Sequence, residues 1–201
     1  VRPPWVQFSP EDKDSIVLEL EAKTAFGTGE HETTSSTAAL MEAIDFNGKS
    51  VLDIGTGTGI LAMFARRRGA KLAVGTEIDP QALPCIAENF ERNHFQDSSA
   101  VLGFLDAFAD DAKFDVIVCN MIRSELWPLR DDIENLLADN GYFVSKFTDV
   151  NASDLKSSTE KISFEMADKK NIKHANVAVT FFIIFYPVNT TFGKNQFGIY
   201  S

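Results

Sequence analysis

The chain has 201 residues, of which 44% are hydrophobic and 24% charged, and its formal net charge is −10. This size and composition suit a globular protein with one core, and no apolar stretch approaches the ~20 residues of a membrane span, so we expect no membrane partner. The acidic excess disfavours a direct nucleic-acid partner, because nucleic acids are bound mainly through Lys and Arg, and it suits a basic target instead.

Apolar strand-like runs alternate with helical patterns, which is typical of a doubly wound, mostly parallel sheet. Helices are expected at Thr34–Ile44 and Gly59–Arg68 and after Asp79-Pro80. Within the last of these, Pro84 predicts a kink or a delayed start, because its ring would clash with the carbonyl four residues earlier. The expected strands are Ser50–Ile54, Leu72–Ile78, Ala100–Phe104, Phe114–Asn120 and Tyr142–Phe147.

Beyond Phe147 we expect a helix around Ser153–Lys161. Two long strands follow, Ile162–Lys169 and Asn176–Pro187, and their short link predicts an antiparallel hairpin at one edge of the sheet. The remaining tail has aromatic residues among Gly, Asn and Thr, so we expect it to pack on the domain.

Two expectations come from what the sequence lacks. Nothing in it resembles a signal peptide, so we expect a cytoplasmic protein. Cys85 and Cys119 fall in a predicted helix and a predicted strand, without the spacing of zinc ligands or of a disulfide framework. We therefore expect reduced, structural thiols and no metal site.

The strongest local signal is a glycine-rich turn that follows the first predicted strand. Gly55, Gly57 and Gly59 allow positive φ angles and the close approach of a ligand, and the helix that begins beyond them directs free N–H groups at it. Asp53 precedes the first glycine by two positions. Ile60 stands where the dinucleotide fingerprint requires its third glycine, so the pattern indicates a nucleotide-like cofactor other than NAD.

Polar residues lie at or just beyond the ends of three of the other predicted strands. In such sheets ligands bind at the carboxyl ends of the strands. Glu77 can accept hydrogen bonds from both hydroxyls of a ribose, Asp106 is placed for an adenine amino group, and Asn120 for the reactive end of the cofactor. Each has an alternative. Asp79 competes with Glu77 but precedes Pro80 as a helix cap, Asp110 and Asp111 compete with Asp106, and Asn120 could merely end a strand.

A second signal lies upstream in the run AFGTGEHETT at Ala25–Thr34. Together with DIGTGTGILA at Asp53–Ala62, GTEIDPQA at Gly75–Ala82 and DVIVCN at Asp115–Asn120, this run resembles the ribosomal protein L11 methyltransferase family. That family uses S-adenosylmethionine. The similarity covers roughly residues 3–150 in order and spacing.

The resemblance implies an α/β class I methyltransferase (Rossmann-like) fold, a three-layer sandwich. Residues 1–33 would form an N-terminal segment with a cofactor-covering loop, residues 34–188 the methyltransferase domain and residues 189–201 the packed tail. Thr33 and Thr34 would hold the loop to the following helix, or simply cap that helix. S-Adenosyl-L-methionine would be bound by Phe26, Gly27, Thr28, Asp53, Gly55, Gly57, Gly59, Glu77, Ile78, Asp106 and Asn120.

The expected catalytic residues are Asn120, Thr28 and His31, with His31 either a base or a group that holds the loop. A sulfonium provides an excellent leaving group, a neutral thioether, so the enzyme must mainly align a neutral nitrogen behind the methyl carbon. A lysine amine, whose pKa is ~10.4, must first lose its proton. We expect Asn120 to orient the amine, and water or a nearby carboxylate to receive the proton.

The leading hypothesis is therefore an N-methyltransferase for a protein lysine or amino group on a basic segment, with a ribosomal protein as one candidate. A small-molecule methyltransferase and a cofactor-binding domain without catalysis stay open, and a nicotinamide dehydrogenase is a remoter alternative. The family also carries a separate N-terminal recognition domain, for which the ~25 residues before the FGTG run are too few. Residues 121–127 and 145–147 depart from the family on the acceptor side, and the oligomeric state is not predicted.

Overall fold

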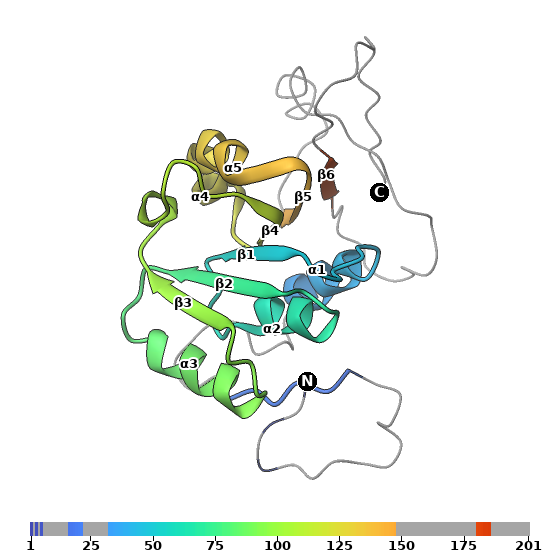
Figure 1. The fold of residues 1–201 in the computed structure, drawn as a ribbon, viewed down its shortest axis with the longest axis vertical. Helices are drawn as coiled ribbons and strands as arrows, with labels where there is room; N and C mark the ends of the chain where they lie inside the picture. The colour runs from blue at the N-terminus through green and yellow to red at the C-terminus, as the bar shows by residue number, and fades with distance from the viewer. Residues whose placement is uncertain (2, 4, 6–15, 22–31, 148–179, 186–201) are drawn as a thin grey trace.

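The computed structural model describes residues 1, 3, 5, 16–21, 32–147 and 180–185. Within these residues a six-stranded sheet lies at the centre, in the order β3-β2-β1-β4-β5-β6 (Figure 1). The five strands β1 to β5 run parallel, and β6 runs antiparallel to β5. The strands are β1 (Ser50–Ile54), β2 (Leu72–Glu77), β3 (Ser98–Leu102), β4 (Phe114–Cys119), β5 (Leu137–Phe147) and β6 (Thr180–Phe185).

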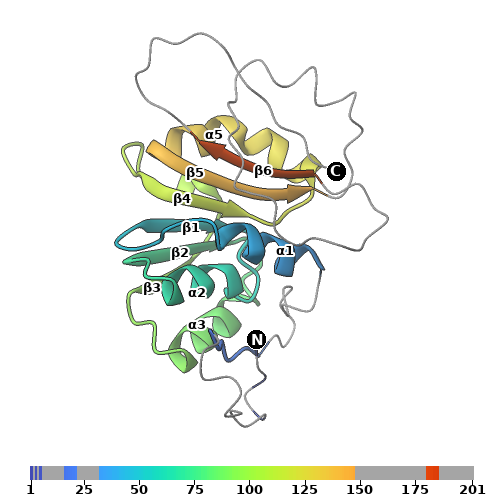
Figure 2. The ribbon, with the colours of Figure 1, turned by 90° about the vertical axis from the view of Figure 1, so that its right-hand side faces the viewer.

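Helices cover both faces of this sheet (Figure 2). One hydrophobic cluster joins Met41, Met63 and Ile86 from the first three helices to the strands, and a second joins Leu126 and Ile133 to the opposite face. The result is a sandwich of three layers. The helices are α1 (Glu32–Met41), α2 (Ile60–Arg67), α3 (Leu83–Arg92), α4 (Arg123–Leu126) and α5 (Arg130–Leu136), with 3-10 turns η2 (Leu105–Ala107) and η3 (Trp127–Leu129).

The two central strands position the site. β1 and β4 are almost entirely buried, because helices cover both of their faces, and this explains their continuous apolar sequences. From β1 the chain proceeds outward through β2 to β3, and then returns to the other side of β1 as β4. A crevice forms where the strand order reverses in this way, at the carboxyl ends of the strands, and ligands bind there in open α/β sheets.

The predicted parallel core is confirmed, with local differences at the ends of elements. β1 has its predicted bounds, whereas β2 and β4 end early enough to leave Ile78 and Asn120 just beyond their strands. Helix α3 begins only at Leu83, with Pro84 in its first turn, which is the delayed start that this proline predicts. Asp79 caps the preceding turn by accepting a hydrogen bond from the amide of Gln81 (2.9 Å).

The carboxy-terminal predictions are tested only in part. Strand β6 lies inside the predicted strand Asn176–Pro187 and pairs with β5, in the register Tyr142 to Phe185. The predicted partner strand Ile162–Lys169, the helix at Ser153–Lys161 and the tail 189–201 lie outside the described residues. The hairpin and the division of the chain near residues 33 and 188 therefore stay predictions. No helix within the described ranges is long and apolar enough to span a membrane.

Candidate functional site at the carboxyl ends of the strands

The glycine-rich turn connects β1 to α2, and its three glycines all have positive φ. The φ angles of Gly55, Gly57 and Gly59 are 65°, 57° and 84°, in the left-handed region that other residues rarely adopt. Space is restricted as well, because a Cβ on Gly59 would lie 2.9 Å from the Phe90 ring. The turn therefore needs glycine for its backbone shape and for its packing on α3.

Asp53 supports this turn from inside the protein. Its side chain is buried, and its Oδ2 accepts hydrogen bonds from the Thr56 hydroxyl (2.7 Å) and from the amide of Ala62 in α2 (3.2 Å). Burial raises the pKa of this carboxyl to about 7, against the lowering effect of these two bonds. Asp53 thus ties the turn to the helix that follows it, and it is not among the residues that line the pocket described below.

Glu77, at the end of β2, joins the turn to the neighbouring strand. Its Oε2 accepts a hydrogen bond from the amide of Gly57 (3.1 Å). Its Oε1 accepts from the amides of Ile78 (2.9 Å) and Asp79 (3.2 Å). Three backbone donors therefore fix the carboxylate at the edge of the crevice. The rival carboxylate, Asp79, has its bond to Gln81 and acts as the cap that the sequence suggested.

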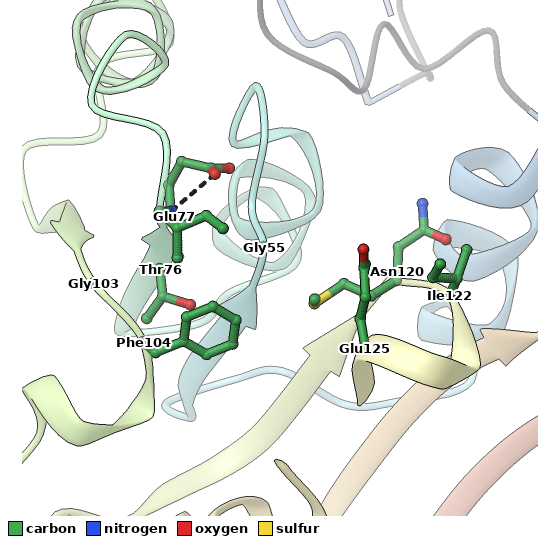
Figure 3. Close-up of a pocket in the computed structure, with 10 residues that line it drawn as sticks. Gly55, Thr76, Glu77, Gly103, Phe104, Asn120, Ile122 and Glu125 are labelled. Carbon is green, nitrogen blue, oxygen red and sulfur yellow. Dashed lines mark hydrogen bonds between the residues drawn. The ribbon is translucent and has the colours of Figure 1, made fainter. Parts of the chain in front are cut away.

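A pocket of about 300 Å³ opens beside Gly55, the one residue of the glycine-rich turn that lines it. Figure 3 shows its two walls: Glu77, Thr76 and Phe104 stand on one side, and Asn120, Ile122 and Glu125 on the other. We call these the β2–β3 wall and the β4–α4 wall. The full lining is Gly55, Thr76, Glu77, Ile78, Gly103, Phe104, Asn120, Met121, Ile122 and Glu125.

Asn120 follows β4 directly, and its amide is oriented by the start of α1. Its Nδ2 donates to the hydroxyl of Thr34 at 3.2 Å and lies 3.5 Å from that of Thr33. Thr34 is buried and Asn120 is half-buried, so this contact lies at the inner side of the pocket wall. The sequence suggested that the two threonines hold a loop to the helix, and in the structure their hydroxyls accept hydrogen bonds from Asn120.

Asp106 is not brought to the pocket with the other predicted residues. It lies in η2 and is exposed, and the pocket is lined at this point by Gly103 and Phe104. Its adenine role stays a prediction. Phe26, Gly27, Thr28 and His31 lie outside the described residues, so their roles stay predictions too.

The sequence placed residues 121–127 on the acceptor side without assigning Met121, Ile122 or Glu125 individually, and it did not indicate Phe104. Phe104, Met121 and Ile122 line the pocket together with the carboxylate of Glu125. These residues could have been found from their position just beyond β3 and β4, because any residue near the carboxyl end of a strand in this fold can contact a ligand. Gly103, with a φ of 142°, marks the point where the chain leaves β3 and places Phe104 at the crevice.

Both cysteines are buried free thiols. Burial raises the pKa of the Cys119 thiol at the end of β4, so it stays protonated and unreactive. Among the described residues no group of three or more His, Cys, Asp or Glu side chains is placed to hold a metal ion.

The strand order, the glycine-rich turn after β1 and the acidic residue that ends β2 define the fold of the class I methyltransferases. A family model described as Ribosomal protein L11 methyltransferase (PrmA) matches residues 1–177. The chain belongs to this family, as the AFGTGEHETT run suggested.

Curated relatives carry the name "Ribosomal protein L11 methyltransferase". The one from Fusobacterium nucleatum subsp. nucleatum is 35% identical over 173 residues, which cover 85% of this chain and 55% of that protein. One from Clostridium botulinum is 37% identical over 146 residues, covering 72% of this chain and 46% of that protein. The chain thus spans about half the length of the curated relatives it matches.

Solved structures match the fold of this chain. The ribosomal protein L11 methylase from Lactobacillus delbrueckii subsp. bulgaricus matches with a TM-score of 0.77 at 26% identity, covering 92% of this chain and 93% of that chain. An RNA methyltransferase from Salinibacter ruber, in complex with S-adenosyl-L-homocysteine, matches with a TM-score of 0.60 at 19% identity, covering 80% of this chain and 95% of that one. The second likeness concerns the fold alone.

Proposed function

We propose that the protein is an S-adenosylmethionine-dependent N-methyltransferase that acts on a lysine or amino group of a protein, with ribosomal protein L11 as the first candidate. The observation that carries the proposal is a pocket with a fixed carboxylate, Glu77, on one wall and an oriented amide, Asn120, on the other. Membership of the ribosomal protein L11 methyltransferase family supports the donor and the acceptor class.

The residues of the β2–β3 wall fit the nucleoside part of this cofactor. Glu77 offers carboxylate oxygens to the two hydroxyls of a ribose, which would replace or share its present backbone bonds. Ile78 and Phe104 provide apolar surface for a purine ring, and Ile78 is 63% exposed where it lines the pocket. Gly55 lines the pocket, and its lack of a side chain lets a ligand approach the backbone closely.

When bound, the cofactor supplies a methyl group on a sulfonium sulfur, which leaves readily as a neutral thioether. The protein must bring an uncharged amine into line, and Asn120 is placed to do so. Because Thr34 accepts from Nδ2, the carbonyl oxygen is the end of the amide that can accept a hydrogen bond from an amine. The orientation of Asn120 is thus set before the acceptor arrives.

Glu125 is the carboxylate of the β4–α4 wall, and we assign it the acceptor side. It is exposed in α4 and lines the same pocket as Asn120 (Figure 3). A carboxylate there attracts the cationic form of a lysine or terminal amine and can receive its proton directly or through water. This fits the net charge of −10, which favours basic partners.

The proposal is tested by following methyl transfer and cofactor binding separately. The protein is incubated with methyl-labelled S-adenosylmethionine and purified ribosomal protein L11, or with a mixture of small amines. Label in L11 supports the proposal, and label only in small amines supports a small-molecule enzyme. Cofactor binding by calorimetry without any transfer points to a binding domain without catalysis. Binding of NAD in its place contradicts the whole assignment.

A further inference from the structure

Two asparagines on α3 hold an extended segment of the chain by its backbone. The amide of Glu21 donates to Asn89 Oδ1 and its carbonyl accepts from Asn89 Nδ2, both at 3.0 Å. One turn later on the helix, Asn93 repeats the pattern with Glu19, at 3.0 Å and 2.7 Å. Each asparagine side chain therefore pairs with one residue's N–H and C=O, as a neighbouring strand would.

The pairing follows from the match of two periods. Residues i and i+4 of a helix are ~6 Å apart along its axis, and residues i and i+2 of an extended strand are ~6.6 Å apart. The alternate residues Leu18 and Leu20 face the opposite way and are buried in the core. Residues 18–21 are thus fixed by backbone bonds on one side and by apolar packing on the other.

Asn89 differs from Asn93 in having a partner inside the glycine-rich turn. Its Nδ2 also donates to the carbonyl of Thr58, at 3.0 Å, and the contact is buried. An amide nitrogen has two hydrogens, and the 3.0 Å bonds to Glu21 and Thr58 occupy them, while the Cys85 sulfur lies farther from Nδ2, at 3.6 Å. Asn93, by contrast, contacts Glu19, the carbonyl of Asn89 and the sulfur of Met63, all away from the turn.

We propose that Asn89 is a positioning residue of the cofactor pocket, which sets the conformation of the glycine-rich turn. Bonding by Glu21 fixes the direction of the Asn89 amide, and this amide in turn holds the Thr58 carbonyl toward α3. The opposite edge of the same peptide carries the amide of Gly59, which donates to the carbonyl of Thr56 at 2.9 Å. With both edges bonded, the peptide between Thr58 and Gly59 cannot rotate, and the turn is rigid before a ligand binds.

The first test needs no cofactor. Amide hydrogen exchange is measured on the wild type, on Asn89→Ala and on the matched control Asn93→Ala, all under conditions where circular dichroism shows them folded. Exchange at Gly57–Ala62 should speed up at least about tenfold in Asn89→Ala, the effect of losing one buried hydrogen bond, and stay within about twofold in Asn93→Ala. Equal acceleration in both variants would show that Asn89 acts only by stabilising the domain.

The second test measures affinity for S-adenosylhomocysteine by calorimetry and rests on the proposed function. Asn89→Ala should raise the dissociation constant about tenfold while Asn93→Ala stays within about twofold. If the wild type does not bind this ligand, the cofactor assignment fails and the exchange result still decides the role of Asn89. Should Asn89→Ala not fold, exchange in the ligand-free wild type decides: the Gly59 amide must exchange as slowly as the amides of α3, and fast exchange overturns the proposal.

Discussion

The hydroxyl of Thr56 donates a hydrogen bond of 2.7 Å to the carboxylate of Asp53, and both side chains are buried beneath the glycine-rich turn. Desolvation outweighs this bond and raises the pKa of Asp53 to about 7 from an ordinary value of 3.8. In this range the folded protein binds a proton that the unfolded chain has already lost. We therefore expect the contribution of Asp53 to the free energy of unfolding to fall as pH rises from about 4 to about 7, and then to level off.

We expect Asp53→Asn to remove this pH dependence, because asparagine carries no titrating group and its oxygen can still accept from Thr56. Urea denaturation between pH 5 and pH 8 measures it, and the wild type should lose up to about 1.4 kcal/mol per pH unit from this residue below pH 7. The comparison uses the slope of the free energy of unfolding against pH, because burying the new amide group changes the absolute stability by itself.

Asp115→Asn is the matched control. Desolvation raises the pKa of Asp115, but hydrogen bonds from the amide and hydroxyl of Ser50 (2.7 Å and 2.8 Å) and nearby lysines outweigh it, and the net pKa is lowered. The stability that ionised Asp115 contributes is fully present above its pKa in the unfolded chain and is lost as pH falls through its lower pKa in the folded protein. Both pKa values lie below pH 5, so Asp115→Asn should not change the slope of the free energy of unfolding between pH 5 and pH 8. A wild-type slope in Asp53→Asn would contradict the prediction.

Packing against the same threonine explains a glycine inside β2. A Cβ on Gly75 would lie 2.6 Å from Thr56 Cγ2 and 2.8 Å from its Cβ, too close for any side chain. We expect Gly75→Ala to destabilise the protein by about 1–3 kcal/mol and to displace Thr56, which also bonds to the carbonyl of Thr76 through its amide (2.9 Å). Cofactor affinity should therefore fall together with stability.

Gly48→Ala separates crowding from backbone strain. Gly48 has a φ of 71° and nothing within 4 Å of a Cβ placed on it, so the substitution strains the backbone without a clash. It should cost about 1 kcal/mol in a denaturation experiment and leave cofactor affinity unchanged, because Gly48 lies at the other end of β1. Gly48→Ala is therefore the control for Gly75→Ala. If Gly75→Ala also binds the cofactor normally, the glycine-rich turn tolerates movement of Thr56.

The sequence predicted the parts of the site that depend on local rules. The spacing of Gly55, Gly57 and Gly59, and carboxylate and amide groups at strand ends, follow from backbone conformation and from the geometry of parallel sheets. It placed residues 121–127 on the acceptor side, but it could not predict which of them reaches the pocket, because this depends on how the short helix α4 leaves β4. The partners of Asn89 lie as far away in sequence as Glu21, and no local pattern indicates them.

Asn120→Ala tests the alignment of the acceptor. The variant loses the group that we expect to hold the amine, so turnover should fall about 100-fold, the effect of misplacing a reacting group, while cofactor affinity changes little. Single-turnover methyl transfer and calorimetry measure the two quantities. Asn47→Ala, at an exposed asparagine before β1, is the control and should behave as wild type. Equal turnover in Asn120→Ala would remove Asn120 from the mechanism.

Thr34→Val tests how Asn120 is oriented. Valine has nearly the shape of threonine but no hydroxyl, so Asn120 Nδ2 loses its 3.2 Å acceptor while the apolar contacts of this buried position are kept. Turnover should fall by less than in Asn120→Ala, about tenfold, because the Thr33 hydroxyl remains at 3.5 Å. In Asn120→Ala the Thr34→Val change should have no further effect. If the double variant instead loses turnover by the product of the two single effects, Thr34 does not act through Asn120.

Glu125→Gln tests the choice of a cationic acceptor. The substitution keeps the size of the side chain and removes its charge, so the KM for a basic protein acceptor should rise about fivefold, as expected for an exposed ion pair worth about 1 kcal/mol. Affinity for the cofactor should stay the same, and the variant should lose part of the salt dependence of KM that a charged contact produces.

Glu134→Gln is the matched control, since Glu134 is an exposed carboxylate on α5 and does not line the pocket. Both variants have the same net charge, so a general effect of the acidic surface would change their KM values equally. A rise confined to Glu125→Gln would assign recognition of the cation to the pocket. An increase in the dissociation constant of S-adenosylhomocysteine in Glu125→Gln, with KM for the acceptor unchanged, would instead place this carboxylate on the cofactor side.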